Sequence, residues 1–318
     1  MNTPLEQARI LHKELQKDEK NVEALLKLTD FMREYEGDDK IVLSTDLEDK
    51  ITELENEKRI YSGIQKLDTI LDGFRSNQVI AISAPPKAGK TQFCVHIAKN
   101  MPNPTMFLFE ETPEEVLYKY KKKGLPLPRF YTHGELIEDS IEGLYRKMIE
   151  AWAKYDSRIF FVDHLHYLLD NEKGQNIGDK IKHVMQELKK FAKRHHFTIF
   201  LIAHMTKGNF TEPPSVEAIR DSSFIPQYAD TTLILWRETY NSGAKEHKNV
   251  FNYTNNLLIN VALNRKINFT TDINTGLADI TFNTQTWGYE PSEWYTEWIK
   301  EGKEEDRAKN EILKKIQT

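Results

Sequence analysis

The sequence has a single cysteine, no long apolar run and no excess of positive charge. Cys94 is the only cysteine among 318 residues, which excludes an intrachain disulfide and fits a reducing compartment. A run of about 18 apolar residues, which a membrane-spanning helix requires, is absent. The formal net charge is −5, so the surface has no general basic coat and any nucleic-acid binding requires a local patch.

The composition supports a folded α/β domain. Hydrophobic residues make up 39% of the chain and charged residues 29%, enough for a sizeable core beneath a well-solvated surface. The first twenty residues mix acidic and basic side chains at helical spacing and lack the pattern of a signal peptide. We therefore expect a cytoplasmic protein without a membrane segment.

Hydrophobic spacing divides the chain into four parts. Residues 1–40 are predicted to form a helical N-terminal extension, and 41–60 a linker helix that packs either on a neighbouring subunit or on its own domain. Residues 61–300 form the predicted core, and 301–318 a charged tail. Because buried strands alternate with amphipathic helices in the core, we expect a mainly parallel sheet with helices on both faces. The predicted strands are 78–83, 105–109, 158–163, 198–203, 231–236 and 257–264, with a short strand within 121–134 and a hairpin at 276–283.

A strand, a loop of small residues and a helix follow one another near residue 84. The loop ends in Gly-Lys-Thr, which is typical of a phosphate-binding loop and rare in an ordinary strand-to-helix turn. The free N–H groups of the helix form an anion site, and the lysine adds a positive charge for the β- and γ-phosphates. The candidate nucleotide-binding residues here are Ala84, Pro85, Pro86, Lys87, Ala88, Gly89, Lys90, Thr91 and Gln92.

Carboxylates follow two of the predicted strands. Asp163 ends the strand 158–163, where a carboxylate can help to hold Mg²⁺ together with the Thr91 hydroxyl. Glu110 and Glu111 follow 105–109, and one carboxylate there can activate the attacking water. For Glu110 we favour a helix N-terminal charge instead.

Three histidines lie near these strand ends. His204 follows 198–203 and can sense the γ-phosphate, or it is a hydrogen-bonded histidine at a sheet edge. His164 and His166 are two residues apart with no cysteine or second pair nearby, which makes a poor metal site. We interpret both as structural.

Seven motifs in order, from Tyr61 to about Tyr289, resemble the RecA-like motor domain of DnaB-type (superfamily 4) replicative DNA helicases. The motifs are Ser62-Gly63 with Leu67-Asp68, the phosphate loop, Phe107–Thr112, Val162–His166, Ala203–Lys207, Ile219–Asp230 with Trp236–Glu238, and Leu263–Arg265. The resemblance implies a ring-forming ATP-dependent helicase or translocase that uses ATP and Mg²⁺ and moves along single-stranded DNA in replication. It also implies a homo-oligomer, a hexameric ring, in a bacterial or phage-infected cell, with a separate primase or loader as a further partner.

The resemblance also implies roles for individual residues. Glu111 matches the catalytic glutamate, His204 the γ-phosphate sensor and Arg237 the arginine that packs on the base. Arg265 matches the arginine that reaches the γ-phosphate of the adjacent subunit and acts in catalysis with Glu111, Lys90 and His204. The segment that borders the DNA channel contributes Lys207, Arg220, Asp221 and Ser223, although the two cations fit a solvated surface equally well.

The sequence departs from the family at several positions. Ala84 replaces the first glycine of the loop, Lys87 a small residue and Leu263 a lysine, while Asp221 and Ser223 replace Glu and Gly. Residues 1–58 are too short for the family's globular N-terminal domain or a fused primase. The alternatives are therefore a non-unwinding RecA-fold ATPase (a recombination mediator, a loader or a KaiC-like regulatory ATPase) and a nucleotide-gated assembly scaffold.

Overall fold

The structure is a computed structural model in which the chain divides into two compact units, Met1–Glu57 and Lys58–Thr318. It describes residues 10, 13–14, 27, 43–48, 51–52, 56–134, 140–169, 176–205, 211–219, 223–241, 251–265, 276–295, 297 and 300. In the first unit, η1 (Ser44–Leu47) is a short 3-10 helix. Most of the predicted extension 1–40 and all of the predicted tail 301–318 lie outside the described residues.

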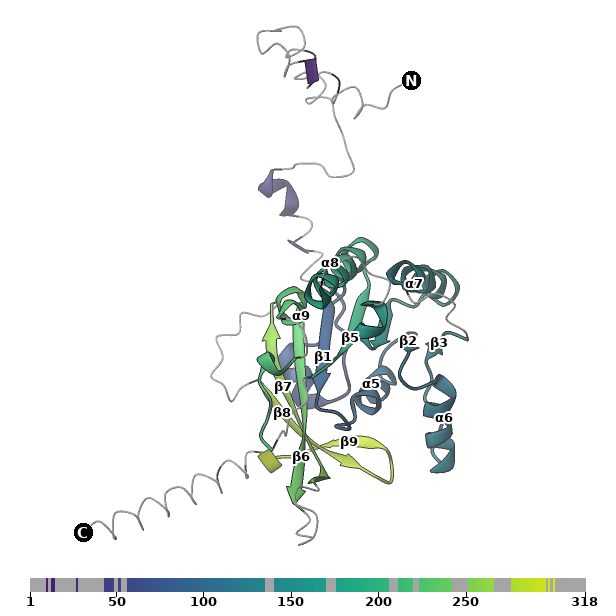
Figure 1. The fold of residues 1–318 in the computed structure, drawn as a ribbon, viewed down its shortest axis with the longest axis vertical. Coiled ribbons are helices and arrows are strands. Elements are labelled where there is room, and N and C mark those ends of the chain that lie inside the picture. Colours follow the sequence, from purple (N-terminus) through teal and green to yellow (C-terminus); the bar gives the residue numbers. More distant parts are fainter. Residues whose placement is uncertain are drawn as a thin grey trace, which may run out of the picture. The chain divides into compact units, whose positions relative to one another are not determined.

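The second unit is built on a nine-stranded sheet in the order β3-β2-β4-β5-β1-β6-β7-β8-β9. The strands from β3 to β6 in this order are parallel, and β7, β8 and β9 continue the sheet in antiparallel pairing. Figure 1 shows these strands and the helices that flank them. The strands are β1 (Val79–Ala84), β2 (Pro104–Leu108), β3 (Tyr131–Thr132), β4 (Ile159–Asp163), β5 (Thr198–His204), β6 (Thr231–Asn241), β7 (Phe251–Asn264), β8 (Leu277–Asn283) and β9 (Gly288–Pro291).

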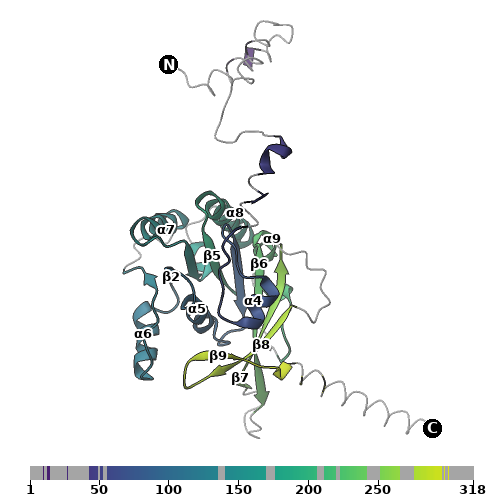
Figure 2. The same cartoon turned by 180° about the vertical axis from the view of Figure 1, so that it is seen from behind.

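Helices cover both faces of the parallel strands, so β1, β2 and β4 are buried along their whole length. Successive residues point to opposite faces: Ile80 and Ile82 pack with α4 and α5, whereas Val79 and Ala81 pack with α7 and α8. Figure 2 shows the sheet from the side opposite to Figure 1. The helices are α4 (Gln65–Leu71), α5 (Lys90–Ala98), α6 (Pro113–Lys122), α7 (Ile141–Tyr155), α8 (Ile177–His195) and α9 (Phe224–Tyr228), with 3-10 turns η2 (Leu165–Leu169) and η3 (Val216–Ala218).

Polar residues fix where the helices begin. Thr112 and Glu115 form a reciprocal capping box at the start of α6, with Pro113 at the first helical position. The Ser140 side chain accepts a hydrogen bond from the Gly143 N–H at the start of α7, and Asn176 makes the equivalent contact at α8. Each such cap contributes about 1 kcal/mol to helix stability.

The motif Ser62-Gly63 has a structural role. The Asp68 carboxylate accepts hydrogen bonds from the Ser62 N–H at 2.8 Å, the Ser62 hydroxyl at 2.7 Å and the Gly63 N–H at 3.0 Å. Gly63 has φ 81°, and a Cβ there would lie 2.4 Å from Asn100 Nδ2. The motif therefore fixes the segment before α4 against the C-terminal end of α5.

The predicted strands are confirmed, but several are longer or differently paired than expected. β6 and β7 extend beyond 231–236 and 257–264, because their polar outer halves pair with each other past the parallel sheet. The hairpin predicted within 276–283 is instead one strand, β8, which turns at 284–287 into β9. Among the described residues, no helix combines the length and the apolar character needed to cross a membrane.

Candidate nucleotide site

The phosphate loop connects β1 to α5. Ala84 is fully buried at the end of β1, where it pairs with His204 in extended backbone, so an alanine fits in place of glycine. Gly89 precedes α5 with φ 92°, a conformation that glycine adopts without strain. Lys87 also has a left-handed backbone, with φ 63°. The first N–H groups of α5 are thus available to an anion.

A cavity of about 440 Å³ lies beside the start of α5. Its volume is in the range of small-ligand sites. The predicted residues Lys90, Thr91 and Glu111 meet here, and Lys119 of α6 donates a hydrogen bond to the Glu111 carboxylate. The lining residues are Lys87, Gly89, Lys90, Thr91, Gln92, Val95, Glu110, Glu111, Val116 and Lys119. The cavity combines cations at the loop with carboxylates at the end of β2.

Lys87 adds a further ammonium group to this cavity, beside those of Lys90 and Lys119. We expect Lys87→Gly to weaken ATP binding about threefold, since an exposed ion pair contributes up to about 1 kcal/mol. Glycine keeps the loop backbone because it adopts the φ of 63° without strain. Isothermal titration with ATP measures the change, with Lys121→Ala on the exposed surface of α6 as control. An unchanged affinity in Lys87→Gly would show that this ammonium does not contact the phosphates.

A buried carboxylate lies next to the loop. Asp163 at the end of β4 is 1% exposed and accepts a hydrogen bond from the Thr91 hydroxyl at 2.7 Å through Oδ2. Its Oδ1 is buried without a hydrogen-bond partner among the described residues. Burial, helped by the nearby Glu110 and Glu111, raises the pKa of Asp163 to about 6 against the lowering effect of Thr91 and Lys90. An orphaned carboxylate oxygen beside a hydroxyl fits the oxygen ligands that Mg²⁺ prefers.

Histidines from two strand ends lie beside Asp163. The rings of His164 and His204 are in edge-to-face contact with centroids 4.2 Å apart, and His204 Nε2 lies 4.0 Å from Glu110 Oε2. Burial, together with His204, His166 and Lys90, lowers the pKa of His164 to about 4. Thr112 and Glu115 cap α6, while Glu110 precedes the cap and faces His204.

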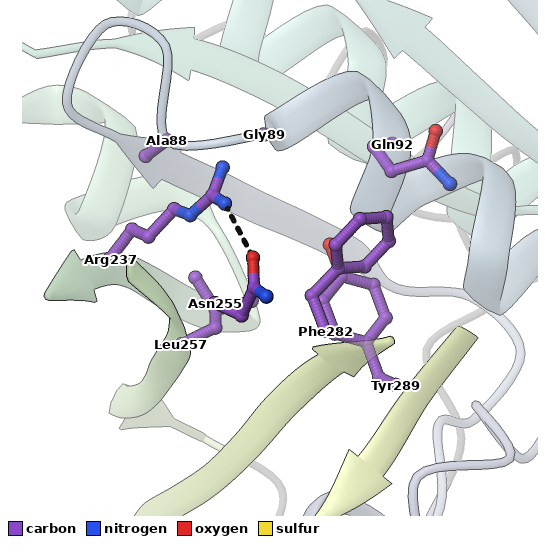
Figure 3. A pocket seen from close by; sticks show the side chains of 8 residues that line it. All are labelled: Ala88, Gly89, Gln92, Arg237, Asn255, Leu257, Phe282 and Tyr289. Atoms are coloured by element: carbon purple, nitrogen blue, oxygen red, sulfur yellow. Dashed lines mark hydrogen bonds between the residues drawn. The ribbon is translucent and has the colours of Figure 1, made fainter. Parts of the chain in front are cut away.

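A smaller pocket of about 50 Å³ lies on the other side of the loop (Figure 3). Arg237 of β6 points into it beside Ala88, and its Nη2 donates to Asn255 Oδ1 at 3.3 Å. Burial lowers the pKa of Arg237. The residues that line the pocket are Ala88, Gly89, Gln92, Arg237, Asn255, Leu257, Phe282 and Tyr289.

The antiparallel strands supply residues that the sequence did not indicate as part of the site. The Tyr253 hydroxyl of β7 donates to the Pro86 carbonyl at 2.8 Å and so holds the loop from outside. Tyr289 of β9 lies edge-to-face against His96, with ring centroids 5.0 Å apart. Asn255 and Phe282 belong to β7 and β8.

Gln92, predicted as a nucleotide-binding residue, donates to the Tyr120 hydroxyl at 2.9 Å.

Arg265 lies beside the amino-terminal ends of the parallel strands, whereas the phosphate loop follows the carboxyl-terminal end of β1. Arg265 follows β7, whose end pairs with the start of β6, and its backbone N–H donates to the Asp230 carbonyl. The length of the six-residue strand β1, roughly 17 Å at the usual strand rise, separates these amino-terminal ends from the loop. The Arg265 guanidinium donates to the carbonyls of Ala229 at 3.1 Å and Gln227 at 2.7 Å. Arg265 therefore cannot reach the phosphate loop of its own chain.

The predicted DNA-contacting residues are mostly beyond what the structure describes. Lys207, Arg220 and Asp221 lie outside the described residues, and Ser223 is an exposed residue directly before α9. Met205 and Ile219 form an antiparallel bridge that closes the intervening segment. His204 is the last residue of β5 and immediately precedes this bridge.

The mainly parallel sheet, its flanking helices and the loop between β1 and α5 define a RecA-like ATPase domain fold. The family DnaB-like helicase C terminal domain matches residues 59–121 and 133–286, and the chain belongs to this family. The "Replicative DNA helicase DnaC" of Bacillus subtilis (strain 168) is 24% identical over 242 residues, which cover 64% of this chain and 53% of that protein. The "Probable replicative DNA helicase" of Trieres chinensis is 22% identical over 233 residues, covering 62% and 51%. The chain thus spans about half the length of the curated relatives it matches.

Solved structures confirm the predicted fold. One of them, an isolated "ATPase Domain", has a TM-score of 0.62 and 17% identity, with 80% of this chain and 100% of that chain covered. A second, "The Structure Of A DnaB-Like Replicative Helicase And Its Interactions With Primase", has a TM-score of 0.58 and 17% identity, with 90% and 75% covered. Both likenesses concern the fold.

Proposed function

We propose that the protein is a ring-forming, Mg²⁺-dependent ATPase that moves along single-stranded DNA and unwinds duplex DNA in replication. The observation that supports hydrolysis most directly is the convergence of Lys90, Thr91 and Glu111 at one cavity, with Asp163 hydrogen-bonded to Thr91. Family membership and relatives named replicative DNA helicases support the motor function.

Each of these side chains has a role that follows from its chemistry. Lys90 and the N–H groups of α5 bind the β- and γ-phosphates, and Arg237 in the small pocket packs against the base. Thr91 and Asp163 would hold Mg²⁺, which would neutralise charge on the phosphate oxygens. Glu111 accepts a proton from the attacking water, and His204 contacts the γ-phosphate from the end of β5.

Catalysis in this proposal requires a second subunit. Because Arg265 lies beside the amino-terminal ends of the parallel strands, it serves the nucleotide of the adjacent subunit in a homo-oligomeric, hexameric ring. Lys207 and Arg220, with Asp221 and Ser223, face the DNA in the centre of the ring. The contacts go to the phosphate backbone, so binding is independent of sequence and weakens with salt. A separate primase or loader is a further partner in the bacterial or phage-infected cell.

The experiment measures ATP hydrolysis of the full chain with and without single-stranded DNA, and strand separation on a forked duplex. We expect DNA to stimulate hydrolysis, salt to weaken the stimulation, and Lys90→Ala to abolish both activities. An ATPase that is indifferent to DNA would refute the motor function. Hydrolysis without strand separation would favour a RecA-fold ATPase that does not unwind DNA.

The second candidate is a RecA-fold ATPase that does not unwind DNA. Leu263 favours it, because this half-buried residue of β7 offers no charge beside Arg265, where the family has a lysine. A ring with one cation fewer at each interface is expected to couple hydrolysis to movement less strongly.

A further inference from the structure

Three side chains that have no assigned role in binding Mg²⁺ converge at the edge of the sheet. Glu110, His164 and His204 follow or end the neighbouring strands β2, β4 and β5. One ligand atom from each lies within 4.8 Å of the others. Because the carboxyl ends of adjacent parallel strands meet at one edge, this convergence is a consequence of the fold.

We propose that Glu110, His164 and His204 form a binding site for a transition-metal dication of the Zn²⁺ type. Two imidazole nitrogens and a carboxylate are a common three-residue zinc set, and the fourth position is open to water. The Nδ1 atom of His164 is buried without a hydrogen-bond partner among the described residues, which leaves its lone pair or its proton unmatched.

The geometry requires only a small contraction around a metal. Ligand atoms on a tetrahedral zinc ion lie about 3.4 Å apart, given metal–ligand bonds of about 2.1 Å. The Glu110 side chain is 56% exposed and the His204 side chain 24%, so both can rotate without disturbing the core. The structure thus supplies three ligands that need only modest side-chain rotation to meet a metal ion.

Ligand chemistry separates this site from the Mg²⁺ site. Mg²⁺ prefers oxygen ligands, so it is expected at Asp163 and Thr91, whereas imidazole favours Zn²⁺ and its neighbours. The sequence spacing of His164 and His166 suggested no metal site, because the second histidine ligand comes from another strand. Cys94 is buried within α5 and offers no competing thiolate.

Occupancy of this site has a consequence for hydrolysis, and this part rests on the proposed function. A metal that holds His204 and Glu110 together keeps His204 from contacting the γ-phosphate. We therefore expect Zn²⁺ to inhibit ATP hydrolysis even when Mg²⁺ is saturating.

The binding test needs no enzyme activity. The full chain without a histidine tag is titrated with Zn²⁺ by calorimetry and with Co²⁺ by visible absorption, which reports four-coordinate nitrogen–oxygen ligation. We expect one metal ion per chain. The metal affinity of His164→Asn and of Glu110→Gln should be at least about tenfold lower than that of the wild type, by analogy with the loss caused by altered metal surroundings. The control is His196→Asn, at an exposed helix end with φ 56°, which asparagine adopts readily. Equal affinity in wild type and His164→Asn would overturn the site.

The hydrolysis test compares variants at free Zn²⁺ concentrations set by a metal buffer. Inhibition should be reversed by a zinc-selective chelator and should require about tenfold more Zn²⁺ in His164→Asn than in His196→Asn. Zinc binding at this site without inhibition would overturn the regulatory part. A chain that binds Zn²⁺ but never hydrolyses ATP would refute the proposed function and leave the metal site standing.

Discussion

Glu111→Gln should reduce ATP turnover about 10²- to 10⁴-fold, the usual contribution of a positioned general base. The amide has nearly the shape of the carboxylate but cannot accept a proton from water at neutral pH. Lys90, Thr91 and Asp163 remain in place, so we expect ATP to bind with unchanged or higher affinity. Steady-state phosphate release measures the turnover, and titration with ATP measures the affinity.

Two control variants separate base catalysis from other effects of this change. Glu110→Gln makes the same substitution at the adjacent position, where the carboxylate faces His204, and should reduce turnover far less. Glu111→Gln also breaks the ion pair with Lys119, which Lys119→Met breaks without removing the carboxylate. If Lys119→Met lost as much activity as Glu111→Gln, the ion pair rather than proton transfer would explain the result.

The parallel half of the fold was predictable because its strands are buried on both faces. Runs such as Ile159–Val162 are apolar without alternation, and amphipathic helices separate them. These apolar runs therefore identified each strand within a residue or two. The outer halves of β6 and β7 contain polar residues such as Thr239 and Asn252. They are held by pairing with each other, which local sequence does not indicate.

The same distinction applies to the site. The phosphate loop is a local motif whose chemistry depends on neighbours in sequence. Thr91 and Asp163 were expected to act together because Asp163 ends a buried strand, and the two side chains are hydrogen-bonded. Tyr253 and Tyr289 reach the loop from strands more than 150 residues away in the chain, by tertiary pairing that no spacing rule specifies. The contact of Glu110 with His204 was missed for the same reason.

Arg265→Ala should reduce ATP turnover about 10³-fold or more while each chain still binds ATP, because the lost cation serves the neighbouring subunit. Within its own chain, the change removes two hydrogen bonds from the exposed Arg265 side chain, an exposed one to the Gln227 carbonyl and a part-buried one to the Ala229 carbonyl. The melting temperature should therefore change little, which thermal unfolding checks. Arg194→Ala, at the exposed end of α8, is the matched control for the loss of one arginine.

A mixing experiment tests whether Arg265 acts between subunits. Lys90→Ala chains have an impaired nucleotide site but an intact Arg265, and Arg265→Ala chains have the converse. When the two inactive variants are assembled together, interfaces that pair an intact site with an intact arginine should recover part of the wild-type turnover. Recovery should disappear when Lys90→Ala and Arg265→Ala are placed in the same chain and mixed with either single variant. If co-assembled single variants stayed inactive, Arg265 would not act in trans, and its position beside the amino-terminal ends of the parallel strands would exclude a direct role in its own site as well.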